Sequence, residues 1–336
     1  MSGTFLAFGE IILRLSPPGR ELLMQSPRLD LWVAGAEANV VTQLARLGHD
    51  AALASAVPAN DLGDGAIAAL RGHGVDTRFI QRRGERIGLY FVTSGAGLRA
   101  TEVIYDRAHS SFATAPAEAW DWGAMLAGVD RLHLSGITPA LGPVSGEAAV
   151  AAVEAAAARG IAVSFDGNWR GKLWARWDGR PRDILSRIVA HADLMFGNHR
   201  DIALLLDQPF SGDGEARRRE AAEAAFAAFP RLQMIASTAR HVENADCHRL
   251  SARIDARDAH AQTEEVALSG IVDRIGAGDA FAAGVLHALR SGEGIDAAAR
   301  SGLALAALKH SLPGDASLFR QADIHAFLAG GLDVRR

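Results

Sequence analysis

Short apolar runs alternate with alanine-rich helical runs through the middle of the chain, and this alternation constrains the fold more than any other feature. We expect strands at residues 131–134, 161–165, 194–196 and 232–237. We expect helices between them at residues 146–159, 184–191 and 216–229. Alternation of this kind predicts an α/β fold with a mostly parallel sheet sandwiched by helices.

The two ends of the chain extend this pattern. The apolar run 5–15 predicts an opening strand that continues past Gly9. Further elements are expected as helices at 38–47, 65–71, 278–290 and 297–310, a strand at 51–57, and a hairpin of 88–93 and 101–105. No linker is visible, so residues 1–336 are expected to form a single domain. Segments near 10–35 and 88–112 are expected to form a small β lid over the sheet edge.

Composition and charge exclude several classes of protein. Lys and Arg number 35 against 39 Asp and Glu, which gives a formal net charge of -4 and no basic excess for nucleic acid. A small acidic ligand must therefore be held by a few placed cations. The first fourteen residues show neither a signal peptide nor a membrane span, and the single Cys247 cannot form an intramolecular disulfide. We expect a cytoplasmic protein.

The segment 273–281, Asp-Arg-Ile-Gly-Ala-Gly-Asp-Ala-Phe, carries the strongest chemical signal. An apolar helical run follows it, so the amides of Gly276, Ala277 and Gly278 would lie at a helix N-terminus, where unpaired N–H groups bind anions. Asp279 would follow just inside the helix, and could accept the proton of a hydroxyl that attacks a phosphoryl group. The alternative is a glycine-rich turn capped by an aspartate.

This segment resembles the C-terminal signature of the ribokinase-like PfkB family of carbohydrate kinases. Residues 35–40 and 44–48 look like the family's N-terminal signature, and residues 60–65 resemble the turn that follows it. The resemblance runs from Phe8 to about Asp315. It implies an ATP-dependent sugar kinase with Mg²⁺, in which Asp279 is the catalytic base and residues 276–278 form the anion hole.

Finer matches point to the branch of the family that phosphorylates 2-keto-3-deoxygluconate. These are residues 88–91, 103–108, 166–170 and 307–315. By this resemblance, the substrate would be bound by Gly35, Tyr90, Tyr105, Arg107, Arg170 and Asp315. Asn39 is suited to sugar hydroxyls. Arginine offers a planar fork matched to a carboxylate, which a keto acid carries and a neutral sugar lacks.

The expected nucleotide side departs from the family pattern at two places. Asn198 is followed three residues later by Asp201, where the family usually has Glu, so a role for Asp201 in holding Mg²⁺ would be indirect. The loop that begins at Ser237 has no glycine nearby, and Arg240 could pair with ATP phosphates instead. We expect Asn198, Ser237 and Arg240, together with the glycines 276 and 278, to bind the nucleotide.

The resulting hypothesis is ATP-dependent phosphorylation of 2-keto-3-deoxygluconate at its C6 hydroxyl, giving 2-keto-3-deoxy-6-phosphogluconate. Two alternatives stay open: a PfkB kinase for fructose, ribose or another keto-deoxy acid, and a sugar-binding regulator with the same fold. The chain contains no GxxxxGK[ST] or GxGxxG sequence, which argues against a P-loop enzyme and a dinucleotide-binding Rossmann enzyme. The expected partners are a small sugar acid and ATP, with no nucleic acid or membrane, and the resemblance implies a homo-oligomer.

Overall fold

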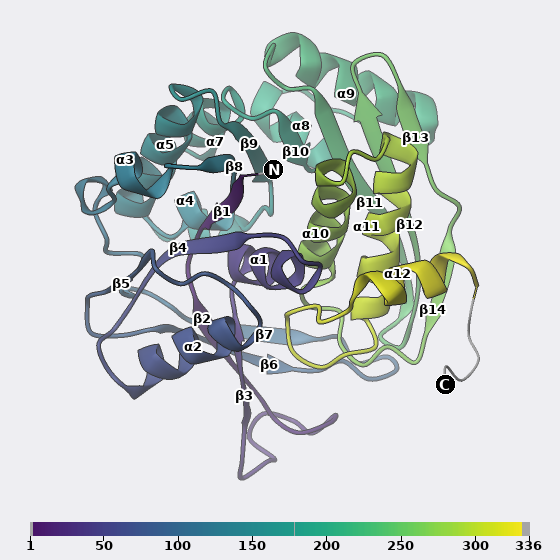
Figure 1. Cartoon of the computed structure of the whole chain (residues 1–336). Coiled ribbons are helices and arrows are strands. Elements are labelled where there is room, and N and C mark those ends of the chain that lie inside the picture. Colours follow the sequence, from purple (N-terminus) through teal and green to yellow (C-terminus); the bar gives the residue numbers. More distant parts are fainter. Residues whose placement is uncertain (1–2, 178, 331–336) are drawn as a thin grey trace.

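A computed structural model describes residues 3–177 and 179–330, so both ends of the predicted 1–336 domain lie outside the described residues. A large twisted sheet runs through the molecule, with helices on both of its faces (Figure 1). Its strands, in spatial order, are β13 (His260–Gln262), β12 (Cys247–Ala256), β11 (Met234–Asn244), β10 (Leu194–Phe196), β9 (Ala162–Asp166), β8 (Val129–Ser135), β1 (Thr4–Phe8), β4 (Ala51–Val57) and β5 (Ile80–Arg82), with β14 (Val266–Ser269) paired to β12.

The strands from β11 to β5 in this order are all parallel to their neighbours, and only the edge formed by β12, β13 and β14 is antiparallel. Parallel strands place their carboxyl ends at one edge of a sheet, and ligands of open α/β sheets bind there. The predicted α/β fold with a mostly parallel sheet sandwiched by helices is therefore confirmed.

Two hydrophobic cores lie on opposite faces of the sheet, because successive strand residues point to opposite sides. In β1, Leu6 and Phe8 belong to one core, and Phe5 and Ala7 to the other. The first core is covered by α3 (Trp122–Met125), α5 (Pro143–Ala157), α6 (Gly171–Trp174), α7 (Pro181–Val189), α8 (His199–Leu206) and α9 (Glu215–Ala228). The second is covered by α1 (Ala36–Arg46), α2 (Asp61–Gly72), α10 (Ala277–Arg290) and α11 (Ile295–Lys309). The short elements α4 (Ile137–Ala140), η1 (Ala117–Ala119) and α12 (Gln321–Leu328) complete the helices.

A separate four-stranded sheet projects from the large one. It contains, in order, β3 (Asp30–Ala34), β2 (Ile12–Ser16), β6 (Gly88–Thr93) and β7 (Glu102–Asp106), and β6 and β7 form the predicted hairpin. These strands fall in the two segments where a lid was expected. The action of this small sheet as a lid stays a prediction.

The prediction of one opening strand over residues 5–15 is wrong. The chain leaves the large sheet after Phe8 and enters the small sheet at Ile12. Between them, Glu10 is buried because its carboxylate pairs with Arg107, which lies 97 residues further along the chain. An ion pair this distant in sequence leaves no periodic signal, so the apolar run reads as one strand.

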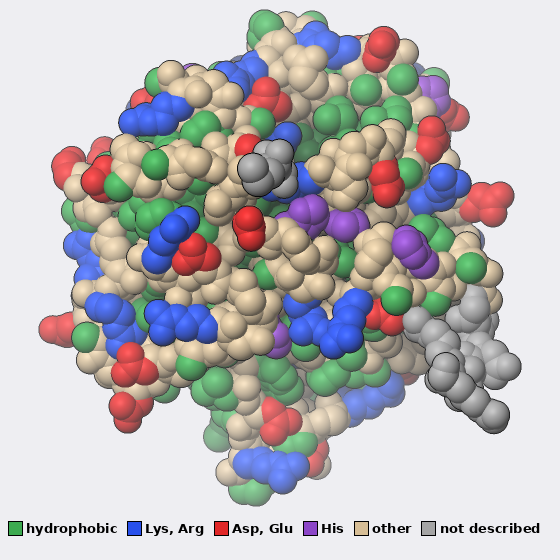
Figure 2. All heavy atoms as spheres, in the orientation of Figure 1, with side chains coloured by type: hydrophobic (Ala, Val, Ile, Leu, Met, Phe, Trp, Pro, Cys, Tyr) green, Lys and Arg blue, Asp and Glu red, His purple; other side chains and the backbone are tan. Residues whose placement is uncertain are grey.

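Strand β11 continues well beyond the predicted end at residue 237. Its second half is polar and pairs with β12 over the register from Thr238↔Ala252 to Asn244↔Cys247. The apolar pattern marks only the buried half, because the extension lies partly in solvent. Acidic and basic side chains are interspersed on the molecular face drawn in Figure 2. Within the described ranges, no helix is long and apolar enough to cross a membrane.

The aromatic cluster around Phe8 provides a test of the first core. The centre of the Phe8 ring lies 4.9–5.1 Å from the ring centres of Phe112, Trp120 and Trp122, and Phe8 is fully buried. We expect Phe8→Ala to lower the free energy of unfolding by about 3–5 kcal/mol, because it removes buried area and leaves a cavity. Denaturant unfolding would measure the change, with Leu98→Ala as the control because Leu98 is 99% exposed. Equal stability of the two variants would contradict this packing.

Candidate active site

The start of α10 is shaped by Gly276, the N-cap residue, whose backbone has a φ of 80°. A Cβ atom at this position would collide with the backbone carbonyl oxygen of Asp315, so both the conformation and the close approach require glycine. The helix begins at Ala277, one residue before the start predicted at residue 278. The first N–H groups of a helix have no partners within it and can bind an anion. In α10 the N–H of Ala277 donates a 3.3 Å hydrogen bond to the carbonyl oxygen of Arg274 in the preceding loop.

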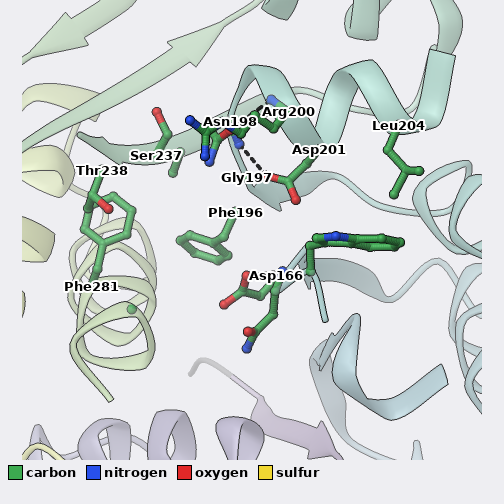
Figure 3. Close-up of a pocket in the computed structure, with 14 residues that line it drawn as sticks. Asp166, Phe196, Gly197, Asn198, Arg200, Asp201, Leu204, Ser237, Thr238 and Phe281 are labelled. Carbon is green, nitrogen blue, oxygen red and sulfur yellow. Dashed lines mark hydrogen bonds between the residues drawn. The ribbon is translucent and has the colours of Figure 1, made fainter. Parts of the chain in front are cut away.

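Three cavities meet at this helix start. The hairpin cavity, about 510 Å³, lies between the small sheet and α10. The strand-end cavity lies at the carboxyl ends of β9 and β10 and beside residues 236–238 of β11 (Figure 3). The β11 cavity continues along α8, β11 and β12. Gly278 lines all three cavities, and Asp166 and Asn168 line both the hairpin and the strand-end cavity. A group bound at Gly278 is therefore accessible both from the hairpin cavity and from the strand-end and β11 cavities.

The predicted residues are brought together around these cavities. The hairpin cavity is lined by Gly35, Asn39, Tyr90, Tyr105, Arg107, Arg170, Arg240, Gly276, Gly278, Asp279 and Asp315. The strand-end cavity is lined by Asn198, Asp201 and Ser237, and the β11 cavity by Ala277 and Arg240. The predicted substrate residues thus share one cavity. Of the predicted nucleotide residues, Asn198, Ser237, Arg240 and Gly278 line the other two, and Gly276 lines only the hairpin cavity.

Asp279 lies at the junction, in the first turn of α10. Asn39, on α1, donates a 2.6 Å hydrogen bond from Nδ2 to Asp279 Oδ2 and so orients the carboxylate. Burial raises the pKa of Asp279 to about 8, with smaller contributions from the nearby carboxylates Asp166, Asp315 and Glu37, and against the effect of Asn39. A carboxylate with this pKa is a stronger base than an exposed aspartate.

Asp166, at the carboxyl end of β9, is a functional candidate that the sequence analysis did not single out. Burial, followed by the charge of Asp201, raises the pKa of Asp166 to about 7, while Arg170 opposes the rise. The carboxylates of Asp166 and Asp201 both line the cavity drawn in Figure 3. The available sequence signal for Asp166 was its position at the end of a buried strand, directly before Gly167 and Asn168.

Asp201 also has a structural task. Its Oδ2 accepts a 2.8 Å hydrogen bond from the backbone N–H of Asn198, the N-cap of α8, and forms a capping box. The Asn198 Oδ1 in turn accepts a hydrogen bond from the backbone N–H of Arg200. Burial raises the pKa of Asp201. The capping interaction fixes one carboxylate oxygen of Asp201 at the rim of the strand-end cavity.

Two of the predicted substrate residues are engaged by buried partners that the sequence analysis missed. Arg107 donates hydrogen bonds from Nε (2.8 Å) and Nη2 to Glu10 Oε2, and its guanidinium lies 5.7 Å from the centre of the Tyr105 ring. Asp315 accepts hydrogen bonds from Arg14 Nη1 (2.9 Å) and from the Tyr90 hydroxyl. The signal for both partners was a charged side chain inside the apolar run 5–15.

Three other arginines face the hairpin cavity without a carboxylate partner within ion-pair distance among the described residues. Arg170 is exposed and donates a hydrogen bond to the neighbouring carbonyl of Trp169. Arg240 and Arg274 lie close enough to repel each other, and burial followed by this repulsion lowers the pKa of Arg240. Cationic side chains in such surroundings favour an anionic ligand.

Residues 4–321 match the model of the pfkB family carbohydrate kinases. A 2-dehydro-3-deoxygalactonokinase from Haloferax volcanii is 33% identical over 334 residues, which cover 98% of each chain.

Two solved structures are similar over nearly their whole length. A 2-dehydro-3-deoxygluconokinase from Thermotoga maritima is 33% identical with a TM-score of 0.92, covering 98% of this chain and 100% of that one. A PfkB family carbohydrate kinase from Listeria grayi is 35% identical with a TM-score of 0.90, covering 97% and 99%. Because the family model and these relatives extend over the glycine-rich motif, the cavities and both sheets, the chain belongs to the PfkB family and is a sugar kinase.

Proposed function

We propose that this kinase transfers the γ-phosphoryl group of ATP to the terminal hydroxyl of a 2-keto-3-deoxy sugar acid, the C6 hydroxyl of 2-keto-3-deoxygluconate. One observation carries the proposal: the cavity that ends at Asp279 and Gly278 has Arg170 and two tyrosines in its wall. The relatives named for the gluconate and galactonate acids support this substrate class.

The acceptor side supplies a carboxylate site and hydroxyl donors. Arg170 is exposed to the cavity and can take the substrate carboxylate with its guanidinium fork. Arg107 lies in the same wall, but its Nε and Nη2 already donate to Glu10. Its guanidinium therefore contributes positive charge in a fixed position and is not free to bind a carboxylate with both of these groups. Tyr90 and Tyr105 stack with ring centres 5.8 Å apart. This stacking gives the small sheet a rigid surface against the sugar.

We assign the phosphoryl transfer to the start of α10. Asp279, oriented by Asn39, accepts the proton of the attacking hydroxyl. The backbone N–H groups of residues 276–278 stabilise the charge on the phosphoryl oxygens during transfer. The small sheet would exclude water, which otherwise competes with the sugar as phosphoryl acceptor.

The nucleotide side offers oxygen and cationic ligands. Asn198 and Ser237 line the strand-end cavity, and Arg240 lies between the nucleotide and substrate sides, where it can pair with phosphates. The raised pKa values of Asp166 and Asp201 show two crowded carboxylates, a donor set that suits Mg²⁺ bound through one or two carboxylates and phosphates. Mg²⁺ bound there would neutralise charge on the phosphates.

Removal of the base tests the assigned chemistry. We expect Asp279→Asn to lower kcat by about two to four orders of magnitude, because the amide cannot accept the proton of the attacking hydroxyl. Steady-state kinetics with Mg-ATP would measure the change, and a thermal melt would show that the variant is folded. Full activity in a folded Asp279→Asn protein would remove Asp279 from this role.

The proposed binding of the substrate carboxylate by Arg170 is tested by comparing acceptors. An ADP-release assay would include both keto-deoxy acids, 5-keto-2-deoxygluconate, fructose and ribose. We expect turnover on the keto-deoxy acids, with the acceptor KM raised about 10- to 100-fold in Arg170→Ala through loss of a charge-assisted hydrogen bond. The control is Arg180→Ala, because that side chain is 85% exposed and pairs with Asp183. Turnover on neutral sugars alone would contradict the proposed contact between Arg170 and a substrate carboxylate.

The pKa of Asp279 predicts a pH profile. The carboxylate acts only when deprotonated, so kcat/KM should rise with pH up to about 8 and then level off. Asn39→Ala removes the hydrogen bond that lowers this pKa, so its profile should lie at higher pH than that of the native enzyme. A profile that is flat from pH 5 upward in the native enzyme, near the ordinary pKa of about 4, would contradict the proposed state of the base.

A further inference from the structure

Lysine is almost absent from this chain. The 35 Lys and Arg residues include two lysines, Lys172 and Lys309. Lys172 is exposed, whereas Lys309, the last residue of α11, is 0% exposed. Arginine serves as the cation elsewhere, including the buried positions 14 and 253. An ammonium is compact and a guanidinium is planar and broad, so position 309 buries a cation of a different shape from those at positions 14 and 253.

The contacts of Lys309 are with backbone oxygens. Its Nζ donates hydrogen bonds to the carbonyl oxygens of Leu312 (3.0 Å) and Asp273 (3.4 Å). The ammonium also lies at the C-terminal end of α11, where the helix dipole favours positive charge. A compact cation held by two carbonyl oxygens in this way is comparable to a monovalent ion that is tethered to the chain.

The carbonyl of Asp273 belongs to the loop that leads into α10. The Asp273 carboxylate accepts a 3.0 Å hydrogen bond from the Ile275 backbone N–H and pairs with Arg14 at 2.6 Å. The backbone N–H groups of Val272 and Asp273 donate to the carbonyl oxygen of His310, at 2.9 and 3.2 Å. The end of α11 therefore holds this loop from one side, and Arg14 of the small sheet from the other.

The charges around Lys309 balance within the protein. Lys309 and Arg14 are opposed by Asp273 and Asp315, and all four side chains are buried. Burial lowers the pKa of Lys309, and the carboxylates of Asp273, Asp315 and Asp279 raise it, while Arg14 acts in the same direction as burial. Without the ammonium, this cluster would carry a net negative charge beside Asp279 and beside the anion site.

We propose that Lys309 is a built-in monovalent cation that fixes the loop from Asp273 to Gly276 and so positions the anion site at the start of α10. It is a positioning residue, since it contacts the loop and not the reacting groups, and the inference rests on the proposed role of this site in phosphoryl transfer. One consequence is that the enzyme needs no dissociable monovalent cation for turnover.

The native enzyme tests this consequence without any substitution. It would be assayed with Mg-ATP and a keto-deoxy acid in a buffer whose only added monovalent cation is tetramethylammonium, and then with K⁺ or NH₄⁺. We expect kcat to change by less than about twofold. Activation of about tenfold or more by K⁺ or NH₄⁺ would overturn the proposal.

Lys309→Ala tests the positioning role, with Lys172→Ala as the matched control. We expect the Lys309 variant to lose about tenfold or more in kcat and to regain part of it with NH₄⁺, but not with tetramethylammonium. Its kcat/KM profile should lie at higher pH, because the positive charge near Asp279 is gone. Lower thermal stability with an unshifted profile and no response to NH₄⁺ would overturn the positioning role.

Nucleotide binding separates this inference from the proposed function. Titration calorimetry with Mg²⁺ and a non-hydrolysable ATP analogue, which keeps the γ-phosphate, would compare the native enzyme with Lys309→Met, which keeps the side-chain length without the charge. We expect weaker binding of the analogue in the variant even if no acceptor in the panel is turned over, because the anion site itself is displaced. Equal affinity for the analogue in a folded variant would overturn the inference and leave the proposed sugar-acid reaction unaffected.

Discussion

The buried ion pairs of Arg14 with Asp273 and Asp315 connect the small sheet to two loops that meet at the start of α10. Arg14 lies on β2, Asp273 lies in the loop before α10, and the backbone carbonyl of Asp315 approaches Gly276. Removing one partner of a buried pair leaves an uncompensated charge, which is costly. The position of the small sheet and the conformation of the anion site therefore depend on the same contacts.

The second constraint is the crowding of carboxylates where the cavities meet. Asp166 and Asp279 have pKa values raised to about 7 and 8 by burial and by neighbouring carboxylates, and the pKa of Glu37 is also raised by burial. Such a site favours added positive charge, which Mg²⁺ or a substrate proton would supply. Arg170, Arg240 and Arg274 lie across the hairpin cavity. The cavity is thus lined by a carboxylate with a raised pKa and by cations, which suits the proposed transfer to an acid with a terminal hydroxyl.

The sequence predicted the parts of this arrangement that are local. The glycine-rich motif located the start of α10 because backbone geometry and helix capping depend on neighbouring residues. The alternating runs predicted the strands β4 and β8 to β11 for the same reason, but not β5 or the antiparallel edge of β12, β13 and β14. The contacts of Glu10 with Arg107, and of Arg14 with Asp315, join segments about 100 and 300 residues apart and have no local pattern. Asp166 was overlooked because only the folded chain shows that its carboxylate lies near Asp279.

A crystal structure of the enzyme with 2-keto-3-deoxygluconate, Mg²⁺ and a non-hydrolysable ATP analogue would test the proposed mechanism most directly. The mechanism predicts the C6 hydroxyl within about 2.6–3.2 Å of the Asp279 carboxylate. It also predicts the γ-phosphate at the amides of residues 276–278 and the substrate carboxylate at Arg170. A substrate bound in the opposite direction, with its carboxylate toward Asp279, would contradict it.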